Sequence, residues 1–380
     1  MRILIHSNAP QVSSGYGKQT ALLLQQLREL GHEPAVSAFA GVSGAPMEWH
    51  GFPIFPCGQF DFGVDTIIPH SLHYGADLTI TLMDFWKLGS IAEQLVQVQV
   101  AAWLPVDCTP LSFLDKETLR RSRAIPIAMS PHGAEQLLEL ADQPGPYIPH
   151  AVDTDVYKPL QMEERTSFRR GMDIDDRFVI GICGANNDQI RKGWPEQFEA
   201  FRRFQLTHDD ALLFVHTIAR SGRGLDLQSL AHHIGIPEKA IRFSDTYAQI
   251  SGIFDDEMMA DWFNVLDVLS SCSYAEAFCV PLIEAQACGT PVVVTNGSAM
   301  ADFKGSGWAV QSQPFWNHVH GAWWNRPDIS AIVKAYEKAY AYAGSRREVA
   351  RGFAVNFDVH AVGRQYWKPF IDSLASSPVS

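Results

Sequence analysis

Short apolar runs alternate with amphipathic stretches along almost the whole chain. The apolar runs are rich in β-branched residues and are bounded by polar or glycine-containing segments, a pattern typical of buried parallel strands. The stretches between them repeat apolar residues every three or four positions, as helices that cover a sheet do. This alternation predicts a parallel α/β architecture. Strands are expected at residues 1–6, 32–39, 78–81, 97–103, 125–128, 178–183, 212–217, 241–244, 268–270 and 292–294.

Helices are expected between many of these strands. The clearest apolar stripe is that of residues 194–208, where Phe198, Phe201 and Phe204 recur at helical spacing. A chain of 380 residues is long enough for two domains, and each half of the pattern reads as a Rossmann-like fold. The expected helices cover residues 18–30, 162–171, 194–208, 258–265, 329–342 and 357–373, with a further one that opens at Pro281.

Composition narrows the class of protein. Apolar residues make up 46% and charged residues 19% of the chain, and no apolar run reaches the ~18–20 residues that span a bilayer. Residues 1–5 enter a strand at once and lack the features of a signal peptide, which predicts a cytoplasmic protein without a transmembrane segment. The six cysteines form no CxxC pair and no zinc-type spacing, so no metal site is expected.

Charge bears on the partners. The formal net charge of −12 disfavours broad binding to nucleic acid or to anionic lipid, which needs a basic surface. A local group of basic residues exists at 116–123, but a solvated helix face is the simpler interpretation. Neither first strand is followed by a Gly-x-Gly-x-x-Gly fingerprint, which makes a nicotinamide or flavin enzyme less favoured.

The strongest chemical signal lies in Glu276-Ala-Phe-Cys-Val-Pro-Leu-Ile-Glu284-Ala-Gln-Ala-Cys-Gly289-Thr-Pro-Val-Val-Val. Glu276 falls in a loop, and Glu284 is expected in the first turn of a helix that starts at Pro281 and ends before Gly289. The start of a helix offers backbone N–H groups and a positive dipole end to a phosphate. Two carboxylates beside it are suited to hydroxyls instead, and hydroxyls on both sides of a phosphate describe a nucleotide sugar.

This segment resembles the E-x7-E signature of the family 4 retaining glycosyltransferases, which have the GT-B fold. The resemblance implies that Glu276 binds the hydroxyls of the donor sugar and that Glu284 binds the ribose. The signature loop departs from the family pattern, because Ala277 and Cys279 stand where glycines are usual. Backbone groups of Phe278, Cys279 and Val280 are still expected to face the sugar, while each added Cβ trims the pocket.

Two further glycine-containing loops match places that the family uses for the donor diphosphate. Residues 184–193 follow the first strand of the second half, and Lys192 matches the family lysine. Ala185 replaces the usual arginine, so Arg191 is expected to supply the second positive charge. In the first half, Gly15 and Gly17 are expected in a loop after the first strand, where glycine permits a close approach of the backbone to the donor.

The acceptor side gives weaker signals. Where the family usually carries a histidine near the reacting carbon, this chain has Asp107, with Asp84 as a second candidate; a helix cap is an equal interpretation for either. Four histidines are candidates for lining the cleft, although a structural role is more common for each: His70, His73, His132 and His150. Trp86, Trp103 and Tyr16 are candidates for stacking on an acceptor ring.

The boundary between the halves resembles the family segment in which the chain passes from one domain to the other, with His150 and Ala151 replacing Asn and Gly. This implies an N-terminal acceptor domain at 1–150, a donor domain at 151–355 and a terminal helix at 356–380 that crosses back to the first domain. The cleft is expected at the carboxyl ends of both sheets. Asp153-Thr-Asp155 spells a D-x-D, but its place at this boundary favours turn and cap roles over manganese binding.

Together with the family resemblance, the sequence therefore predicts a two-domain GT-B protein that moves a sugar from a nucleotide-diphosphate sugar to an acceptor hydroxyl. The resemblance implies that the reaction retains configuration and needs no metal or other cofactor. The acceptor is left open between a small molecule, a glycan and a modified nucleic acid. Two alternatives are a glycosyltransferase acting on a modified DNA base and a non-catalytic nucleotide-sugar-binding protein.

Overall fold

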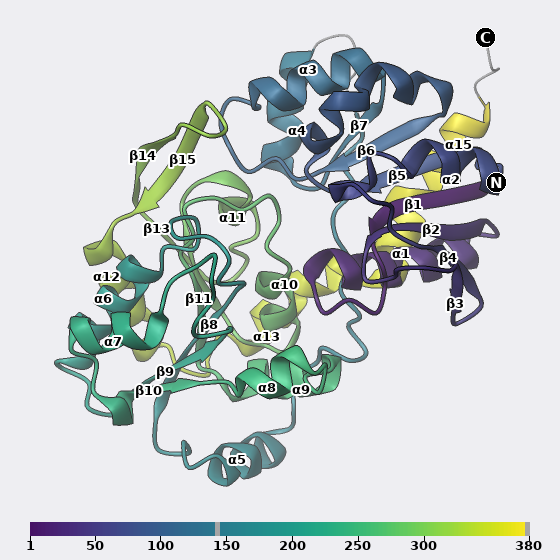
Figure 1. The fold of residues 1–380 in the computed structure, drawn as a ribbon. Coiled ribbons are helices and arrows are strands. Elements are labelled where there is room, and N and C mark those ends of the chain that lie inside the picture. Colours follow the sequence, from purple (N-terminus) through teal and green to yellow (C-terminus); the bar gives the residue numbers. More distant parts are fainter. Residues whose placement is uncertain (141–144, 377–380) are drawn as a thin grey trace. The chain divides into compact units, whose positions relative to one another are not determined.

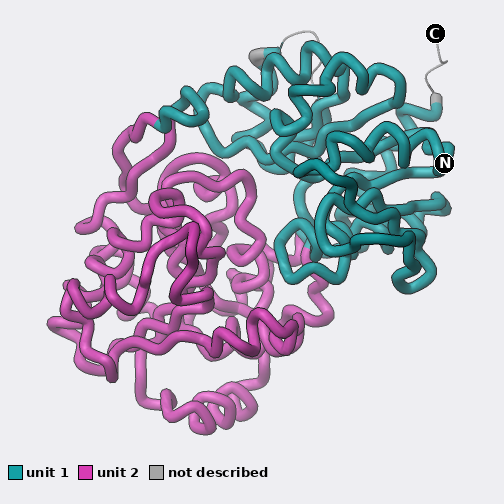
Figure 2. Tube along the Cα trace, viewed as in Figure 1, with its two compact units in different colours: residues 1–151, 317–322, 357–380 teal, residues 152–316, 323–356 magenta. Residues whose placement is uncertain are grey.

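The computed structural model describes residues 1–140 and 145–376, and these form two compact units (Figure 2). Unit 1 comprises Met1–Ala151, Asn317–Ala322 and Phe357–Ser380, and unit 2 comprises Val152–Trp316 and Trp323–Asn356. Residues 377–380, the end of the predicted terminal helix, lie outside the described residues.

Unit 1 is built on a seven-stranded sheet in the order β3-β4-β2-β1-β5-β6-β7 (Figure 1). Its pairs are parallel except that β3 runs antiparallel to β4 at the edge. Strands β5 and β6 are buried along their whole length and β1 is buried in its middle five residues, as expected of a sheet covered on both faces. The strands are β1 (Arg2–Asn8), β2 (Glu33–Ala40), β3 (Met47–Trp49), β4 (Phe52–Phe55), β5 (Leu78–Leu82), β6 (Val100–Leu104) and β7 (Ile125–Ala128).

The helices of unit 1 begin at polar caps. The side chain of Ser14 accepts a hydrogen bond from Gly17 N, that of Ser112 from Asp115 N, and that of Ser130 from Gly133 N. The segment at 85–97 is a 3₁₀ helix, so the predicted strand 97–103 starts three residues too early. The α-helices are α1 (Gly15–Glu29), α2 (Ile67–Tyr74), α3 (Phe113–Ser122) and α4 (Pro131–Leu137).

The C-terminal segment completes unit 1. The side chain of Gln26 donates to the carbonyl of Val359 (2.7 Å), and the rings of Trp103 and Trp367 meet edge to face at 5.0 Å. The predicted terminal helix at 357–373 is present but starts two residues later: α14 (Val359–Val362) continues through a π-helical turn (Gly363–Trp367) into α15 (Lys368–Ser376).

Unit 2 is built on a six-stranded parallel sheet in the order β10-β9-β8-β11-β12-β13. Residues 312–317 and 322–327, which the sequence patterns did not predict as strands, pair in a separate two-stranded sheet. The strands are β8 (Phe178–Cys183), β9 (Ala211–His216), β10 (Ile241–Phe243), β11 (Val268–Ser271), β12 (Val292–Thr295), β13 (Trp308–Val310), β14 (Ser312–Asn317) and β15 (Ala322–Pro327).

Helices cover the sheet of unit 2, with α6, α7 and α12 on one side and α9, α10 and α13 on the other (Figure 1). The phenylalanine stripe of α6 is fully buried against the sheet, as its spacing predicted. Helices of this unit are α5 (Met162–Gly171), α6 (Trp194–Gln205), α7 (Leu227–Ile234), α8 (Thr246–Ile250), α9 (Asp256–Val265), α10 (Val280–Ala287), α11 (Ser298–Asp302), α12 (Ile329–Ala341) and α13 (Arg347–Ala354).

Together the two units confirm the predicted fold class of two Rossmann-like α/β halves. Within the two described stretches, no helix combines the length and apolar character needed to cross a bilayer.

Candidate active site

Two loops at the carboxyl ends of neighbouring strands form the candidate site in unit 2. The first, residues 184–193, follows β8, and the second, residues 272–279, follows β11, which pairs with β8. Asp188 shapes the first loop by accepting hydrogen bonds from the N–H groups of Ile190 and Arg191. The carbonyl of Arg191 then accepts from Tyr274 N (2.7 Å), which joins the two loops.

Glu276 and the two predicted cations meet directly. Arg191 Nη1 lies 2.9 Å from Glu276 Oε2, and Lys192 Nζ lies 2.5 Å from Oε1. The exposed fractions of the Arg191, Lys192 and Glu276 side chains are 28%, 14% and 9%, so the cations are the more accessible partners. Two positive charges against one negative leave this cluster with a net positive charge.

Glu276 is held as a carboxylate. Burial favours the neutral acid, but the charges of Lys192 and Arg191, with hydrogen bonds from Lys192 and Ser273, outweigh burial and lower the pKa of Glu276 to about 2. Glu276 is therefore an acceptor of hydrogen bonds at neutral pH and cannot serve as a general acid. A carboxylate has about four lone-pair sites, so the two contacts to cations leave room for donors such as hydroxyls.

Sequence reasoning missed the residues that fix this cluster. Gln197, on α6, donates to the carbonyl of Lys192 (2.8 Å) and accepts from Ser270 Oγ and Cys272 N, which ties both loops to one buried amide. Ser298 Oγ accepts from the backbone N–H of Glu276 (3.2 Å). Gln197 lies four residues after the first loop but is far in sequence from the second, and Ser298 follows the second loop by 19 residues; neither belongs to a recognisable motif.

Gly193 has a structural reason to be glycine. It caps α6 with a φ of +58°, and a Cβ there would lie 2.6 Å from the carbonyl oxygen of Cys272. Glycine at this position therefore allows the two loops to approach each other.

Helix α10 begins beside the cluster. Cys279 is its N-cap with a φ of +71°, so the first helical residue is Val280, and Pro281 takes the second position, one later than predicted. The charges of Glu276 and Lys192 both act on Cys279, where burial raises the pKa of the thiol to about 11. The thiol is consequently protonated at neutral pH. Phe278 turns its ring into the core against Phe303 (4.3 Å), which leaves only its backbone for ligand contact.

Glu284 is the fifth residue of α10, one position further into the helix than predicted, and only 5% of it is exposed. Its charge contributes to raising the pKa values of Tyr157 and Cys288, which places the carboxylate near both groups. The structure thus brings Arg191, Lys192 and Glu276 together with Cys279, and it places Glu284 deeper along the same helix.

The remaining predicted donor and acceptor residues belong to unit 1. Asp107 follows β6, and its charge contributes to raising the pKa of Asp115 to about 6, an effect that arises chiefly from burial. Gly15 and Gly17 were predicted in a loop, but they form the first turn of α1 instead. A Cβ on Gly17 would meet the carbonyl oxygen of Val12 at 2.2 Å, whereas one on Gly15 would meet nothing within 4 Å.

Two of the acceptor-side candidates are core residues. Trp103 is 1% exposed, donates from Nε1 to the carbonyl of Ile148 (2.8 Å) and packs edge to face on His150 (4.4 Å). Burial lowers the pKa of His150 to about 3. The hypothesis that Trp103 stacks on an acceptor is therefore wrong, and His150 has the structural role that was the more common interpretation for these histidines.

The other candidates have varied settings. His70 Nδ1 shares a hydrogen bond with Ser37 Oγ (2.9 Å), and His73 packs against Phe55. Trp86 lies under the ammonium of Lys87 (3.8 Å to the ring centroid). Asp153 Oδ1 accepts from the N–H groups of Asp155 and Val156, so it shapes a turn.

The segment that contains this cluster matches the sequence model of a protein family. Residues 185–348 match the family model of glycosyl transferases group 1. This glycosyl transferases group 1 match includes Arg191, Lys192, Glu276 and Glu284, together with the start of α10.

Curated relatives align over parts of the chain. The D-inositol 3-phosphate glycosyltransferase of Streptomyces scabiei is 36% identical over 130 residues, which cover 32% of this chain and 27% of the relative. That of Xylanimonas cellulosilytica is 28% identical over 154 residues, 38% of this chain and 33% of the relative. The chain thus matches about a quarter to a third of the length of these relatives.

Solved structures share the fold over the whole chain. Sucrose-phosphate synthase of Thermosynechococcus elongatus superposes with a TM-score of 0.75 at 18% identity, covering 99% of each chain. HepE of Anabaena in complex with UDP gives 0.71 at 16% identity, covering 99% of this chain and 100% of HepE, and HepE is also known in complex with UDP-glucose. At these identities the likeness shows the two-domain GT-B fold and nothing finer.

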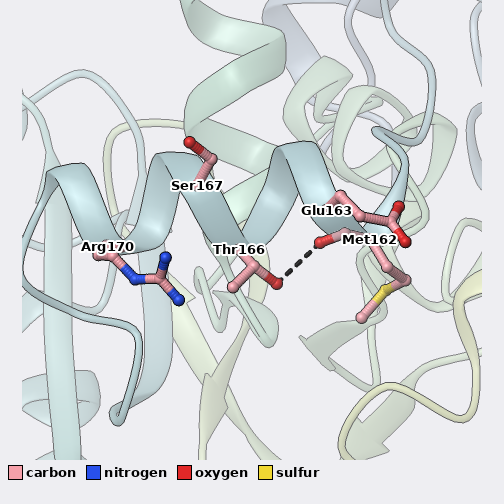
Figure 3. Close-up of a pocket in the computed structure, with 5 residues that line it drawn as sticks. All are labelled: Met162, Glu163, Thr166, Ser167 and Arg170. Atoms are coloured by element: carbon pink, nitrogen blue, oxygen red, sulfur yellow. Dashed lines mark hydrogen bonds between the residues drawn. The ribbon is translucent and has the colours of Figure 1, made fainter.

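A surface hollow of about 350 Å³ lies away from these loops, along α5 (Figure 3). It is lined by five side chains of this one helix, including Glu163 and Arg170, and Thr166 Oγ1 returns a hydrogen bond to the carbonyl of Met162 (2.8 Å). None of the cluster residues contributes to it. The candidate site therefore rests on the two loops.

Proposed function

We propose that this protein is a retaining glycosyltransferase that takes a sugar from a nucleotide-diphosphate donor and transfers it to an acceptor hydroxyl. The single observation that carries the proposal is the contact of Arg191 and Lys192 with Glu276 beside the start of α10, inside the segment that matches glycosyl transferases group 1. The curated relatives are glycosyltransferases, and HepE, which has the same fold, is known with UDP-glucose.

The net positive cluster suits the leaving group. When the glycosidic bond breaks, negative charge develops on the nucleoside diphosphate, and cations already in place stabilise it without reorganisation. Arg191 presents a planar fork that matches phosphate oxygens, and Lys192 adds a compact charge. The dipole at the start of α10 acts in the same sense, so the chain's own groups supply the stabilisation that a bound metal would otherwise give.

The carboxylates suit the hydroxyls on each side of the diphosphate. Glu276, ionised and partly satisfied by its two cations, accepts from hydroxyls of the donor sugar. Glu284 is assigned to the ribose. No group of the cluster is a candidate for a covalent nucleophile, because Glu276 is engaged by cations and the Cys279 thiol is protonated. We therefore propose a front-face reaction, in which the departing phosphate oxygen takes the proton of the acceptor hydroxyl.

Donor binding is the first test. Thermal unfolding is measured with UDP, ADP and GDP, each compared with its monophosphate, for the wild type and for Lys192→Gln. A ligand at about 100 times its Kd stabilises by about 2.7 kcal/mol. One nucleoside diphosphate should stabilise the wild type far more than its monophosphate does, and Lys192→Gln should lose this difference. Equal responses to diphosphates and monophosphates would refute the diphosphate assignment.

Stereochemistry is the second test. Slow hydrolysis of the matching nucleotide sugar replaces transfer to an unknown acceptor, and proton NMR of the first-formed sugar reads its anomeric configuration. Retention gives the same configuration as in the donor. Inversion would contradict the front-face reaction while leaving donor binding intact.

A further inference from the structure

A second hollow lies in unit 2, between the edge strand β13 and helix α12, and has a volume of about 480 Å³. Three lysines line it: Lys304 from the loop after α11, and Lys334 and Lys338 from α12. We propose that this hollow binds a small phosphorylated molecule, with the phosphate on the three ammonium groups. This site is separate from the Arg191–Lys192–Glu276 cluster and does not depend on the function proposed for that cluster.

The lining of the hollow carries more positive than negative charge. Among the described ion pairs none involves Lys304, Lys334 or Lys338, although the chain as a whole carries −12. The nearest acid on the same helix turn, Glu337, lies 3.4 Å from His208 Nε2 instead. The one carboxylate in the lining, Asp328, accepts from Ala331 N (2.7 Å) as the N-cap of α12. The lining therefore keeps an excess of positive charge.

Two of the lysines lie close together on one helix. Lys334 and Lys338 lie one turn apart on α12, and like charges at this spacing destabilise a helix by roughly 0.2–0.5 kcal/mol. An anion between the two ammonium groups converts this repulsion into attraction. Lys304 lies in the loop after α11, so a ligand that contacts all three lysines would bind to two separate elements of unit 2.

The backbone of β13 adds a neutral donor. Val310 directs its carbonyl to Asn296 N (2.8 Å), on the side of β12. Because successive residues of a parallel strand direct their backbone groups to opposite sides, Ala309 directs its N–H and carbonyl toward the open edge. Ala309 lines the hollow, and its N–H can supplement the ammonium groups on a phosphate oxygen.

The remaining lining fits an organic part rather than a bare phosphate. Trp308 contributes to the lining, and the guanidinium of Arg346 lies over its ring, 4.6 Å from the centroid. Ala331 and Ala335, on α12, add small apolar side chains to the lining. A volume of about 480 Å³ lies within the ~300–1,000 Å³ range of small-molecule sites, so the hollow accommodates a sugar-sized group beside the phosphate.

The test compares titration calorimetry of inorganic phosphate, pyrophosphate and glucose 6-phosphate at constant ionic strength. The proteins are the wild type, Lys334→Gln/Lys338→Gln, and a matched control, Lys158→Gln/Lys239→Gln, which removes two exposed lysines of unit 2 outside the hollow. Lys334→Gln/Lys338→Gln should bind glucose 6-phosphate at least tenfold more weakly than the wild type and the control variant do. A fourth protein, Arg191→Gln/Lys192→Gln, should keep this binding, because it alters only the other cluster.

The outcomes separate the alternatives. If glucose 6-phosphate binds more tightly than inorganic phosphate, the organic part contributes. If pyrophosphate binds most tightly, and this binding is weakened by Lys334→Gln/Lys338→Gln but not by Arg191→Gln/Lys192→Gln, the ligand of the hollow is a diphosphate. If Lys334→Gln/Lys338→Gln binds all three anions like the wild type, or if the wild type binds none of them, the proposal is overturned.

Discussion

Glu276 shows how a buried carboxylate is kept charged. Burial by itself would favour the neutral acid, and two cations within 3 Å reverse that preference. The cost of burying three charged groups is reduced because Arg191 and Lys192 remain partly exposed. The same exposure leaves both cations accessible to a further anion, which is the property that the proposed donor requires.

Replacing Glu276 with Gln tests this balance. The amide keeps the shape but removes the charge, so Arg191 and Lys192 lose their anionic partner and one acceptor becomes a donor. Donor hydrolysis should fall by roughly 100-fold or more, the scale of losing one preorganised electrostatic contact. Steady-state kinetics with the nucleotide sugar checks this, and Glu163→Gln, on the exposed face of α5, is the control. Activity within twofold of the wild type would contradict the role of Glu276.

Single residues of the site were only partly predictable. Glu276 and Lys192 were predicted because they match motifs of the resembled family in loops after apolar strands, and Arg191 because it lies beside Lys192 where the usual arginine is replaced by Ala185. Gln197 and Ser298 were not found, since a glutamine on a helix and a serine at a helix start have no distinctive local pattern. Their roles come from hydrogen bonds to residues far along the chain, which only the fold brings close.

At the scale of elements, α6 holds both loops through Gln197. Its amide oxygen accepts from Ser270 Oγ and Cys272 N, and its amide nitrogen donates to the carbonyl of Lys192. Gln197 is 1% exposed, so water does not replace these contacts when they are lost. This helix therefore sets the distance between the loop that carries the cations and the loop that carries Glu276.

Gln197→Met should lower the free energy of unfolding by about 2–3 kcal/mol, because it leaves the buried N–H of Cys272 without its acceptor. If Gln197 also positions the cations, KM for the donor should rise several-fold. Gln197→Glu, which keeps the acceptor toward Ser270 and Cys272, should recover part of both losses. Denaturant unfolding and donor kinetics measure the two effects. A loss of stability with unchanged KM would restrict Gln197 to a structural role.

The start of α1 gives a second prediction, on two glycines two residues apart. Gly17→Ala should lower stability by about 1–3 kcal/mol, since its Cβ would overlap the carbonyl oxygen of Val12 at 2.2 Å. Gly15→Ala, with nothing within 4 Å, should raise stability by about 0.5–1 kcal/mol. Thermal unfolding compares them. Equal effects would show that the packing around Gly17 is not as described.

The same pair tests the donor contact predicted for Gly15. If its backbone approaches the donor, Gly15→Ala should weaken nucleoside-diphosphate binding while making the protein more stable. Unchanged binding would leave Gly15 as an ordinary residue of the first helical turn.

Elements were predictable where the apolar pattern was regular. The strands at 125–128 and 178–183 and the helix at 162–171 have the predicted bounds, because each is a continuous pattern between polar or turn residues. The hairpin of β14 and β15 was missed, since its tryptophans and polar residues alternate poorly and are largely exposed. The start of α1 was missed because glycines in a first turn look like a loop.

Across the whole molecule, buried histidines make stability depend on pH. Burial lowers the pKa values of His6 and His216 to about 4 and that of His150 to about 3. Below pH 6.5 the unfolded chain takes up these protons while the folded chain does not, so stability is lost as pH falls from about 6.5 to about 4. Asp115 acts in the opposite sense, because burial raises its pKa to about 6.

His6 and His150 belong to unit 1, where the opposite effect of Asp115 offsets part of their effect on stability. His216 belongs to unit 2. Near pH 5 each unit should therefore lose about 1 kcal/mol of stability per pH unit. Calorimetric unfolding at pH 7, 6 and 5 measures this for each transition. His216→Gln should flatten the slope of unit 2 alone. Constant stability over this range in both units would contradict the burial of these histidines as neutral groups.

The chain visits unit 1 three times, at residues 1–151, 317–322 and 357–380. During synthesis on the ribosome, all of unit 2 therefore emerges before unit 1 has its final segment, which supplies the partners of Gln26 and Trp103. Domains of many proteins mature in the order in which they are made. In this chain unit 2 should therefore complete its folding before unit 1. Until residues 357–380 have been synthesised, Trp103 lacks the contact with Trp367.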